Sequence, residues 1–227
     1  MKITWIGQAG LLLDNGKAKI MVDPYLSNSV EKVEPKNFRR IPVNKAFLDI
    51  EPDVMIFTHD HLDHYDPETA PVFLGKERKK KTVLSPFSVW QKARTLGGEH
   101  NYVLFDRSTQ WTEHGCRFTA VKAAHSDPYA IGVLIEDISE NKVYYITGDT
   151  LYSSEIFKDL PNSIDIIFIP INGVGNNMNV SDAVRFFRKS GAKKAVPYHV
   201  GMFDELSTDI FEDENKLLLK IYEETEV

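Results

Sequence analysis

The sequence that decides the fold reads Asp-Val-Met-Ile-Phe-Thr-His-Asp-His-Leu-Asp-His and covers residues 53–64. Its first half is a short apolar run, which predicts a strand buried on both faces. The second half has the form H-x-H-x-D-H. Residues i and i+2 of an extended segment point the same way, so His59 and His61 can bind one ion together, while Asp63 and His64 on the following turn can serve a second. Two ions about 3.5–4 Å apart are the arrangement of two-metal hydrolysis, so the stretch predicts a dinuclear metal site.

Three further candidate ligands each follow a predicted strand, and a strand gives a rigid support from which a loop residue can be aimed. They are His125 after 117–123, Asp149 after 142–147 and His199 after 195–198. Alone, each would more often be an ordinary hydrogen-bonded histidine or a turn residue. Beside the four-residue cluster they are predicted to be ligands, because that cluster leaves coordination unfilled.

The remaining pattern is many strands first, followed by strands mixed with helices. Asp14-Asn15-Gly16 predicts a hairpin between strands 10–13 and 18–22, and residues 25–47 read as a long loop. Helices are predicted where apolar residues have helical spacing or capping residues flank them: one opened by Pro67, then 86–96, 153–160, a helix capped by Ser181 and ended by Gly191, and 211–224. Two packed sheets with helices outside fit this order, so we predict an α/β layered sandwich forming a single domain over residues 1–227.

Composition limits the partners. The 227 residues carry a net charge of −6, which does not favour nucleic-acid binding. No apolar run approaches the ~20 residues of a membrane span, and the N-terminus lacks the apolar region of a signal peptide. The single cysteine, Cys116, allows no internal disulfide and is expected to be buried. We therefore predict a cytoplasmic protein with a small-molecule substrate and without nucleic-acid or membrane partners; a homo-oligomer is left open. His100 and His114 are expected at the surface.

The chain resembles the metallo-β-lactamase superfamily of metal-dependent hydrolases, in particular its L-ascorbate-6-phosphate lactonase-like branch. The resemblance rests on Asp23-Pro24, on the motif at 59–64, and on Ala-His-Ser, Gly-Asp-Thr and Pro-Tyr-His around the three later ligands. It implies a four-layer αββα sandwich. It further implies a first metal held by His59, His61 and His125, a second held by Asp63, His64 and His199, and a bridge between them through Asp149.

The predicted chemistry is hydrolysis by a hydroxide that bridges two divalent ions. A set of imidazoles and carboxylates suits Zn or Mn, with Fe or Ni as further candidates. Asp63 and Asp149 are the predicted catalytic residues. We expect a small anionic substrate, a lactone or a phosphodiester, with Arg39, Arg40 and Tyr198 as substrate-binding candidates. The glycine-rich loop 172–177 is a weaker candidate for anion binding. The alternatives are a non-catalytic metal-binding module and a redox member of the same fold.

Overall fold

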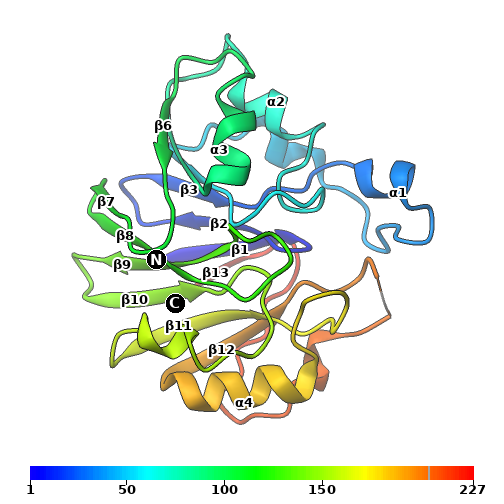
Figure 1. Ribbon diagram of the computed structural model, residues 1–227, viewed down its shortest axis with the longest axis vertical. Coiled ribbons are helices and arrows are strands. Elements are labelled where there is room, and N and C mark those ends of the chain that lie inside the picture. Colours follow the sequence, from blue (N-terminus) through cyan, green and yellow to red (C-terminus); the bar gives the residue numbers. More distant parts are fainter. Residues whose placement is uncertain (204) are drawn as a thin grey trace. The chain divides into compact units, whose positions relative to one another are not determined.

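The computed structural model describes residues 1–203 and 205–227, and the chain divides into two compact units. The first unit comprises Met1–Phe105 together with Leu219–Val227, and the second comprises Asp106–Leu218. Each unit is built on one mixed β-sheet (Figure 1). The single domain expected over residues 1–227 stays a prediction.

The sheet of the first unit has the strand order β13-β1-β2-β3-β4-β5-β6. Its strands are β1 (Lys2–Gly7), β2 (Gly10–Asp14), β3 (Lys19–Val22), β4 (Val54–Ile56), β5 (Thr82–Ser85), β6 (Asn101–Leu104) and β13 (Glu224–Glu226). The predicted hairpin joins β2 to β3, where the Asn15 side chain accepts hydrogen bonds from the backbone N–H groups of Lys17 and Ala18. From β3 to β6 the pairing is parallel, so these strands end at the same edge of the sheet.

The sheet of the second unit has the strand order β12-β11-β10-β9-β8-β7. Its strands are β7 (Gln110–Glu113), β8 (Cys116–Lys122), β9 (Ile131–Asp137), β10 (Lys142–Ile146), β11 (Ile164–Pro170) and β12 (Ala192–Tyr198). Strands β7 to β10 pair antiparallel, whereas β10, β11 and β12 pair parallel. Both units therefore follow one plan, an antiparallel meander continued by parallel strands, and the parallel strands present their carboxyl ends together. Ligand sites in parallel sheets commonly lie at such ends.

Helices cover the parallel part of each sheet. In the first unit α3 (Phe87–Ala93) packs against β5 and β6, and in the second α4 (Val180–Ser190) packs against β11 and β12 (Figure 1). The buried face of α4 carries Phe186, whose ring lies 4.8 Å from that of Phe157. Gly191 ends α4 with φ +71°, as predicted, because glycine enters the left-handed region without a side-chain clash. The N-cap is Asn179 and not Ser181, since the Asn179 side chain accepts a hydrogen bond from the backbone N–H of Asp182.

The predicted C-terminal helix over residues 211–224 is wrong. Apart from the 3₁₀ helix η3 (Thr208–Ile210) just before it and strand β13 at its end, this region is irregular. Several of its backbone groups bond to strands: Ala195 N–H donates to Asn215 O, Leu217 N–H to Ala195 O, and Tyr222 N–H to Trp5 O, while the bonds printed within the segment, such as Lys216 N–H to Asp213 O, are those of short turns. Tertiary pairing with β12 and β1 thus overrides the helical spacing of the apolar side chains.

Other helices are shorter than predicted or lie elsewhere. The loop 25–47 contains α1 (Ser29–Val33) and the start of the 3₁₀ helix η1 (Lys45–Asp49). The helix expected from Pro67 is α2 (Ala70–Leu74), with a proline in its own first turn. The helix over 153–160 reduces to the 3₁₀ helix η2 (Ile156–Lys158), and 86–96 to α3.

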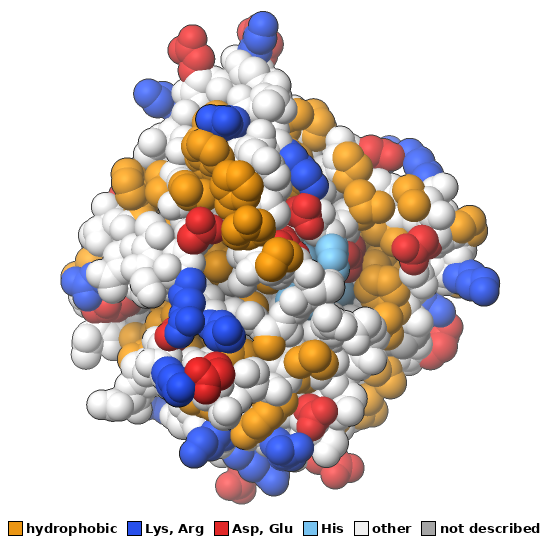
Figure 2. Space-filling view, viewed as in Figure 1, with side chains coloured by type: hydrophobic (Ala, Val, Ile, Leu, Met, Phe, Trp, Pro, Cys, Tyr) orange, Lys and Arg blue, Asp and Glu red, His pale blue; other side chains and the backbone are white. Residues whose placement is uncertain are grey.

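Burial confirms two of the three expectations made for isolated residues. Cys116 is fully buried in β8 and His114 is exposed. His100 is buried with 9% exposure, so the prediction that it lies at the surface is wrong. Burial lowers the pKa of His100, and the nearby Lys81 ammonium lowers it further. Among the described residues, no helix combines the length and apolar content that a bilayer-spanning segment requires. On the face shown in Figure 2, apolar side chains gather in several groups, and cationic and anionic side chains lie between these groups and around the rim.

Candidate metal centre

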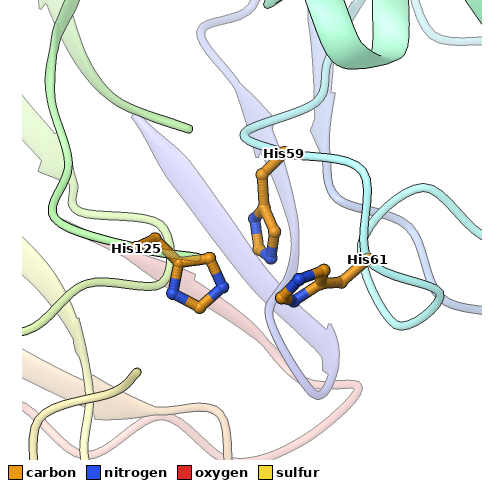
Figure 3. Close-up of side chains that lie close together, drawn as sticks. All are labelled: His59, His61 and His125. Carbon is orange, nitrogen blue, oxygen red and sulfur yellow. The ribbon is translucent and has the colours of Figure 1, made fainter. Parts of the chain in front are cut away.

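The H-x-H-x-D-H motif forms a tight turn directly after β4. The carbonyl of His61 accepts hydrogen bonds from the backbone N–H groups of His64, at 3.0 Å, and of Tyr65, at 2.8 Å. This closure brings Asp63 and His64 back beside His59, whose ring centroid lies 3.9 Å from that of His64. His59 and His61 lie edge to face with centroids 4.6 Å apart (Figure 3). The first unit therefore gathers its four predicted ligands into one cluster.

A buried carboxylate supports this cluster from behind. Asp23 follows β3, whose neighbour in the sheet is β4, so it lies beside the start of the motif. Its Oδ1 accepts the backbone N–H of Thr58 at 2.8 Å, and its Oδ2 accepts the Thr58 hydroxyl at 2.6 Å. Oδ2 also lies 2.8 Å from Nδ1 of His64. Asp23 is fully buried with φ +43°, a backbone conformation that aspartate tolerates better than most residues.

These contacts determine which nitrogen each imidazole offers. A carboxylate can only accept, so Nδ1 of His64 carries a hydrogen and Nε2 keeps its lone pair. The Thr58 hydroxyl donates its hydrogen to Asp23. It therefore acts as an acceptor towards Nδ1 of His59, which lies 3.1 Å away. Both histidines thus present an unprotonated Nε2, the form in which imidazole binds a metal. Asp23-Pro24 entered the sequence analysis as part of the family resemblance, and this supporting role was missed.

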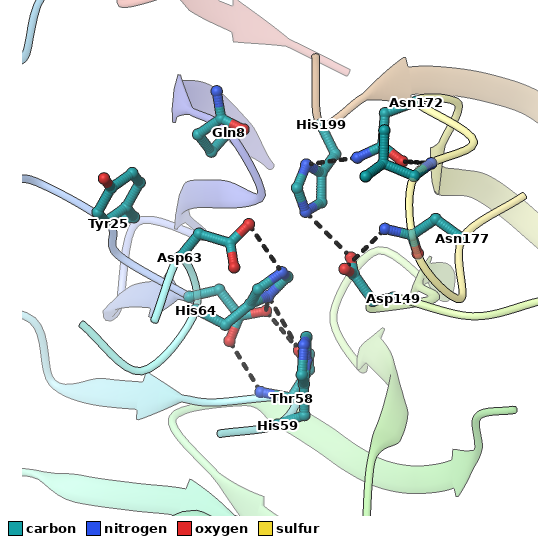
Figure 4. Close-up of polar contacts among 12 residues, drawn as sticks. Gln8, Tyr25, Thr58, His59, Asp63, His64, Asp149, Asn172, Asn177 and His199 are labelled. Atoms are coloured by element: carbon teal, nitrogen blue, oxygen red, sulfur yellow. Dashed lines mark hydrogen bonds and ion pairs between the residues drawn. The ribbon is translucent and has the colours of Figure 1, made fainter. Parts of the chain in front are cut away.

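The second unit collects its polar residues at the carboxyl ends of β10, β11 and β12. Asp149 follows β10, Asn172 follows β11 and His199 follows β12. Nε2 of His199 lies 3.1 Å from Oδ1 of Asp149, and the Asn177 amide donates to Oδ2 of Asp149 at 2.7 Å (Figure 4). The Asn172 amide nitrogen lies 3.2 Å from Nδ1 of His199. Two predicted ligands are therefore in direct contact, and each is supported by an asparagine that sequence reasoning had placed in a candidate anion loop.

His125 lies three residues beyond the end of β8 and is partly exposed. Its Nδ1 lies 3.2 Å from the backbone carbonyl of Asn176. Because a carbonyl only accepts, Nδ1 carries the hydrogen and Nε2 is the nitrogen left for a metal. The same loop, 172–177, thus contacts all three predicted ligands of the second unit.

The three predicted substrate-binding residues all contact neighbouring protein groups. Arg39 donates to the Tyr25 carbonyl at 2.7 Å, and its guanidinium stacks 4.8 Å from the ring of the same tyrosine. Burial raises the pKa of Tyr25 to about 12, against the opposing effect of Arg39. The Arg40 guanidinium stacks on Phe38 at 4.8 Å. Tyr198 is 1% exposed and packs on Phe168. Their roles in substrate binding stay predictions.

The donor set fits divalent transition metals. Five of the seven predicted ligands are nearly or fully buried, with exposures between 0% and 6%: His59, Asp63, His64, Asp149 and His199. Burying so many imidazoles and carboxylates is costly unless they are paired or bind a cation. All seven end in nitrogen or oxygen donors, and several belong to groups of histidine and acidic side chains that could hold a metal ion. The roles of all seven side chains as metal ligands stay predictions, as do the catalytic roles of Asp63 and Asp149 and the identity of the metal.

Comparison with known proteins identifies the family. The family model of the beta-lactamase superfamily domain matches residues 18–200. A UPF0173 metal-dependent hydrolase of Carboxydothermus hydrogenoformans is 26% identical over 229 residues, covering 95% of this chain and 92% of the relative. Among solved structures, isothiocyanate hydrolase from Delia radicum gut bacteria superposes with a TM-score of 0.74 at 18% identity, covering 100% of this chain and 99% of that chain.

The metallo-β-lactamase fold protein YhfI from Bacillus subtilis superposes with a TM-score of 0.73 at 16% identity, covering 99% of both chains. These likenesses confirm the predicted αββα fold class. The relatives named as metal-dependent hydrolases support a hydrolase with a metal-binding His/Asp set. The chain therefore belongs to the metallo-β-lactamase superfamily.

Proposed function

We propose that the protein is a dinuclear metallohydrolase that binds its two metal ions through the seven predicted ligands. His59, His61 and His125 would hold one ion, Asp63, His64 and His199 the other, and Asp149 would lie between them. A four-coordinate ion takes three or four protein ligands. The first unit offers four such side chains and the second three, so neither set alone suffices for two ions. The seven side chains together are enough for two such ions.

The observation that carries this proposal is the way the histidines are supported. His59, His64 and His125 each have Nδ1 next to an oxygen acceptor, at 3.1, 2.8 and 3.2 Å. Each is thereby fixed in the form that offers Nε2 to a cation. Buried histidines are hydrogen-bonded whatever their task, so what matters is the shared result, which is that all three keep Nε2 for a ligand. Three residues fixed alike, in two different units, favour a common ligand-binding task.

The chemistry follows from the family and the donor set. Two bound divalent ions would lower the pKa of a water molecule towards ~7 and so supply a hydroxide for attack on a carbonyl carbon or a phosphorus. The side chains of this chain would orient the ions and exclude bulk water, because the site residues are mostly buried. We propose a small anionic lactone or phosphodiester as substrate, with Arg39, Arg40 and Tyr198 at its edge. Zn or Mn are the favoured ions, and Fe or Ni are the further candidates.

The test compares two aspartate variants. Asp149→Ala removes the proposed shared ligand, whereas Asp60→Asn alters a residue of the same motif whose carboxylate pairs with Lys92 at 2.6 Å. We expect Asp149→Ala to lose metal and nearly all hydrolysis of a lactone and phosphodiester panel, and Asp60→Asn to keep both. Metal content is measured by elemental analysis of the purified protein.

A wild-type rate and full metal content in Asp149→Ala would overturn the assignment. Full metal content without hydrolysis of any substrate in the panel would favour the non-catalytic alternative, and oxidation chemistry on the loaded protein would favour the redox one.

A further inference from the structure

The long loop over residues 25–47 carries the proposed substrate residue Arg39, and a buried threonine fixes the beginning of this loop. The hydroxyl of Thr69, just before α2, accepts the backbone N–H of Leu26 at 3.0 Å. The same hydroxyl donates its hydrogen to Oδ2 of Asp66. An amide N–H only donates and a carboxylate only accepts, so the directions of both hydrogen bonds are fixed by the groups themselves. All three residues are buried, with exposures between 0% and 4%.

Asp66 attaches this threonine to the metal-binding motif, which ends two residues earlier. Its Oδ1 accepts the backbone N–H of Glu68 at 3.1 Å, and its backbone carbonyl accepts the N–H of Ala70 at 2.8 Å. With Oδ2 bonded to Thr69, the carbonyl and both carboxylate oxygens of Asp66 are hydrogen-bonded. The beginning of the loop is therefore fastened to a rigid turn that continues the motif.

The residue before Leu26 holds Arg39. The carbonyl of Tyr25 accepts Nη1 of Arg39 at 2.7 Å, and the guanidinium lies 4.8 Å from the centroid of the tyrosine ring. On the other side a Cβ added to Gly7 would lie 2.5 Å from Nη2 of Arg39, so glycine leaves the room that the guanidinium occupies. Among the described residues Nη2 has no hydrogen-bond partner, and its two N–H groups stay available for an anion.

Tyr25 also connects this arginine to the motif. Its side chain is drawn next to Asp63 in Figure 4. Burial raises the pKa of Tyr25 to about 12, and the charges of Asp66 and Asp63 add to this rise. Charges act in this way only over short distances. The Arg39 guanidinium thus stacks on a ring that lies beside the predicted metal ligands of the first unit.

We propose that Thr69 is a positioning residue for the binding of an anionic substrate. Its hydroxyl links Asp66 to Leu26 and thereby keeps Tyr25 and Arg39 in place. Without this link the guanidinium spends part of its time elsewhere, and the apparent affinity for the anion falls by the same fraction. This inference rests on the proposed function, because it takes the substrate to be an anion that meets Arg39.

A positioning role separates KM from kcat. Among the described residues, the Thr69 hydroxyl bonds to Leu26 and Asp66 and to none of the predicted metal ligands. Once a substrate is bound, the chemical step therefore proceeds as before, and the change is one of binding alone. A substrate without a negative charge gains little from Arg39 and should not respond to a change at Thr69.

The test uses an anionic substrate and its uncharged analogue with the metal-loaded full chain. The pair is a phosphorylated lactone with its unphosphorylated form, or a phosphodiester with the corresponding methyl triester. In Thr69→Val, which keeps the shape and removes the hydroxyl, KM for the anion should rise about tenfold, roughly the value of one hydrogen bond. The kcat for the anion and both constants for the uncharged analogue should stay within about twofold of the wild type, well below that change.

Hydrogen exchange of the Leu26 amide gives a second readout that needs neither metal nor substrate. In metal-free Thr69→Val this exchange should be about tenfold faster than in the wild type, because the amide has lost its acceptor. Thr69→Ser keeps a hydroxyl and should restore slow exchange and a low KM. Thr95→Val is the matched control, because the Thr95 hydroxyl donates to the Lys92 carbonyl at an exposed position. It should behave as the wild type.

A double variant shows whether Thr69 acts through Arg39. Arg39→Ala removes the guanidinium, so adding Thr69→Val to it should raise KM for the anion no further. A second tenfold rise in the double variant would mean that the threonine acts elsewhere, and would refute the inference.

The outcomes also distinguish this inference from the function on which it rests. If the wild type hydrolyses the anion and Thr69→Val keeps its KM, the positioning role is refuted and the hydrolase stands. An equal rise of KM for the anion and its uncharged analogue refutes it too, because the threonine then only supports the fold. If the wild type hydrolyses no anionic substrate, the proposed function and this inference fall together. Should Thr69→Val fail to fold, Thr69→Cys carries the same comparison, since a thiol is a much weaker acceptor.

Discussion

Asp23→Asn tests whether one buried carboxylate orients the motif histidines. The substitution keeps shape and tolerance of φ +43° but replaces one acceptor oxygen by an NH₂ group. If Oδ1 keeps its 2.8 Å bond to the Thr58 N–H, the new amide faces the Thr58 hydroxyl and Nδ1 of His64. The hydroxyl can rotate and accept. His64 can accept only by moving its hydrogen to Nε2, the nitrogen needed by a metal.

The expected magnitude follows from the bonds that change. Losing a charge-assisted hydrogen bond within a fully buried network costs about 1.5–3 kcal/mol of the free energy of unfolding, and loss of such support lowers metal affinity by about 10–100-fold. Urea unfolding in the presence of a chelator measures the first, and Zn²⁺ competition measures the second. Asp14→Asn is the matched control, because Asp14 accepts the Gly16 N–H at an exposed turn. If Asp23→Asn equals this control in both measurements, the orienting role is refuted.

Two further predictions concern the second unit. Gly191→Ala should lower the free energy of unfolding by about 1 kcal/mol, because φ is +71° at the end of α4. Gly191→Asn should lower the free energy of unfolding by less, as measured in the same urea titration. Equal stability of the wild type and both variants would contradict the argument. Hydrogen bonds from Arg107 hold the pKa of the Asp159 carboxyl below its usual value. The ionised Asp159 therefore stabilises the fold above the unfolded-state pKa, and this stabilisation is lost as pH falls through the folded-state pKa. Asp159→Asn should therefore be destabilising at neutral pH, and its difference from the wild type in unfolding titrations should close as pH falls through the folded-state pKa of Asp159; a difference independent of pH would contradict this.

Strands β1 to β12 were predictable because each carries its own signal, whereas β13 was missed. The apolar run before His59 and the hairpin at Asp14-Asn15-Gly16 need no distant partner to be recognised, and both are confirmed. The segment 211–224 was not predictable, since its apolar residues have helical spacing while its backbone partners, Ala195 and Trp5, lie far away in the sequence. Local periodicity contains no information about such pairing.

The candidate site also has a part that could be predicted from the sequence and a part that could not. The candidate ligands were recognisable from residue type, spacing and strand ends; the first unit brings its four together, and the second brings Asp149 and His199 into contact. The residues that orient them were not. Asp23, Asn172 and Asn177 are common turn residues, and only the parallel pairing of neighbouring strands places them behind histidine or aspartate side chains. A rule could have found them: polar residues after the strand adjacent to a ligand strand are candidates for its support.

The backbone at His199 decides how its chemistry should be probed. His199 has φ +61°, a conformation that most side chains reach only with strain. An alanine there would remove the imidazole and also penalise the main chain, so a loss of metal from that variant would mix two effects. Asparagine settles into this geometry more readily and lacks the ring. His199→Asn is therefore the better variant for measuring what the imidazole alone contributes to metal binding.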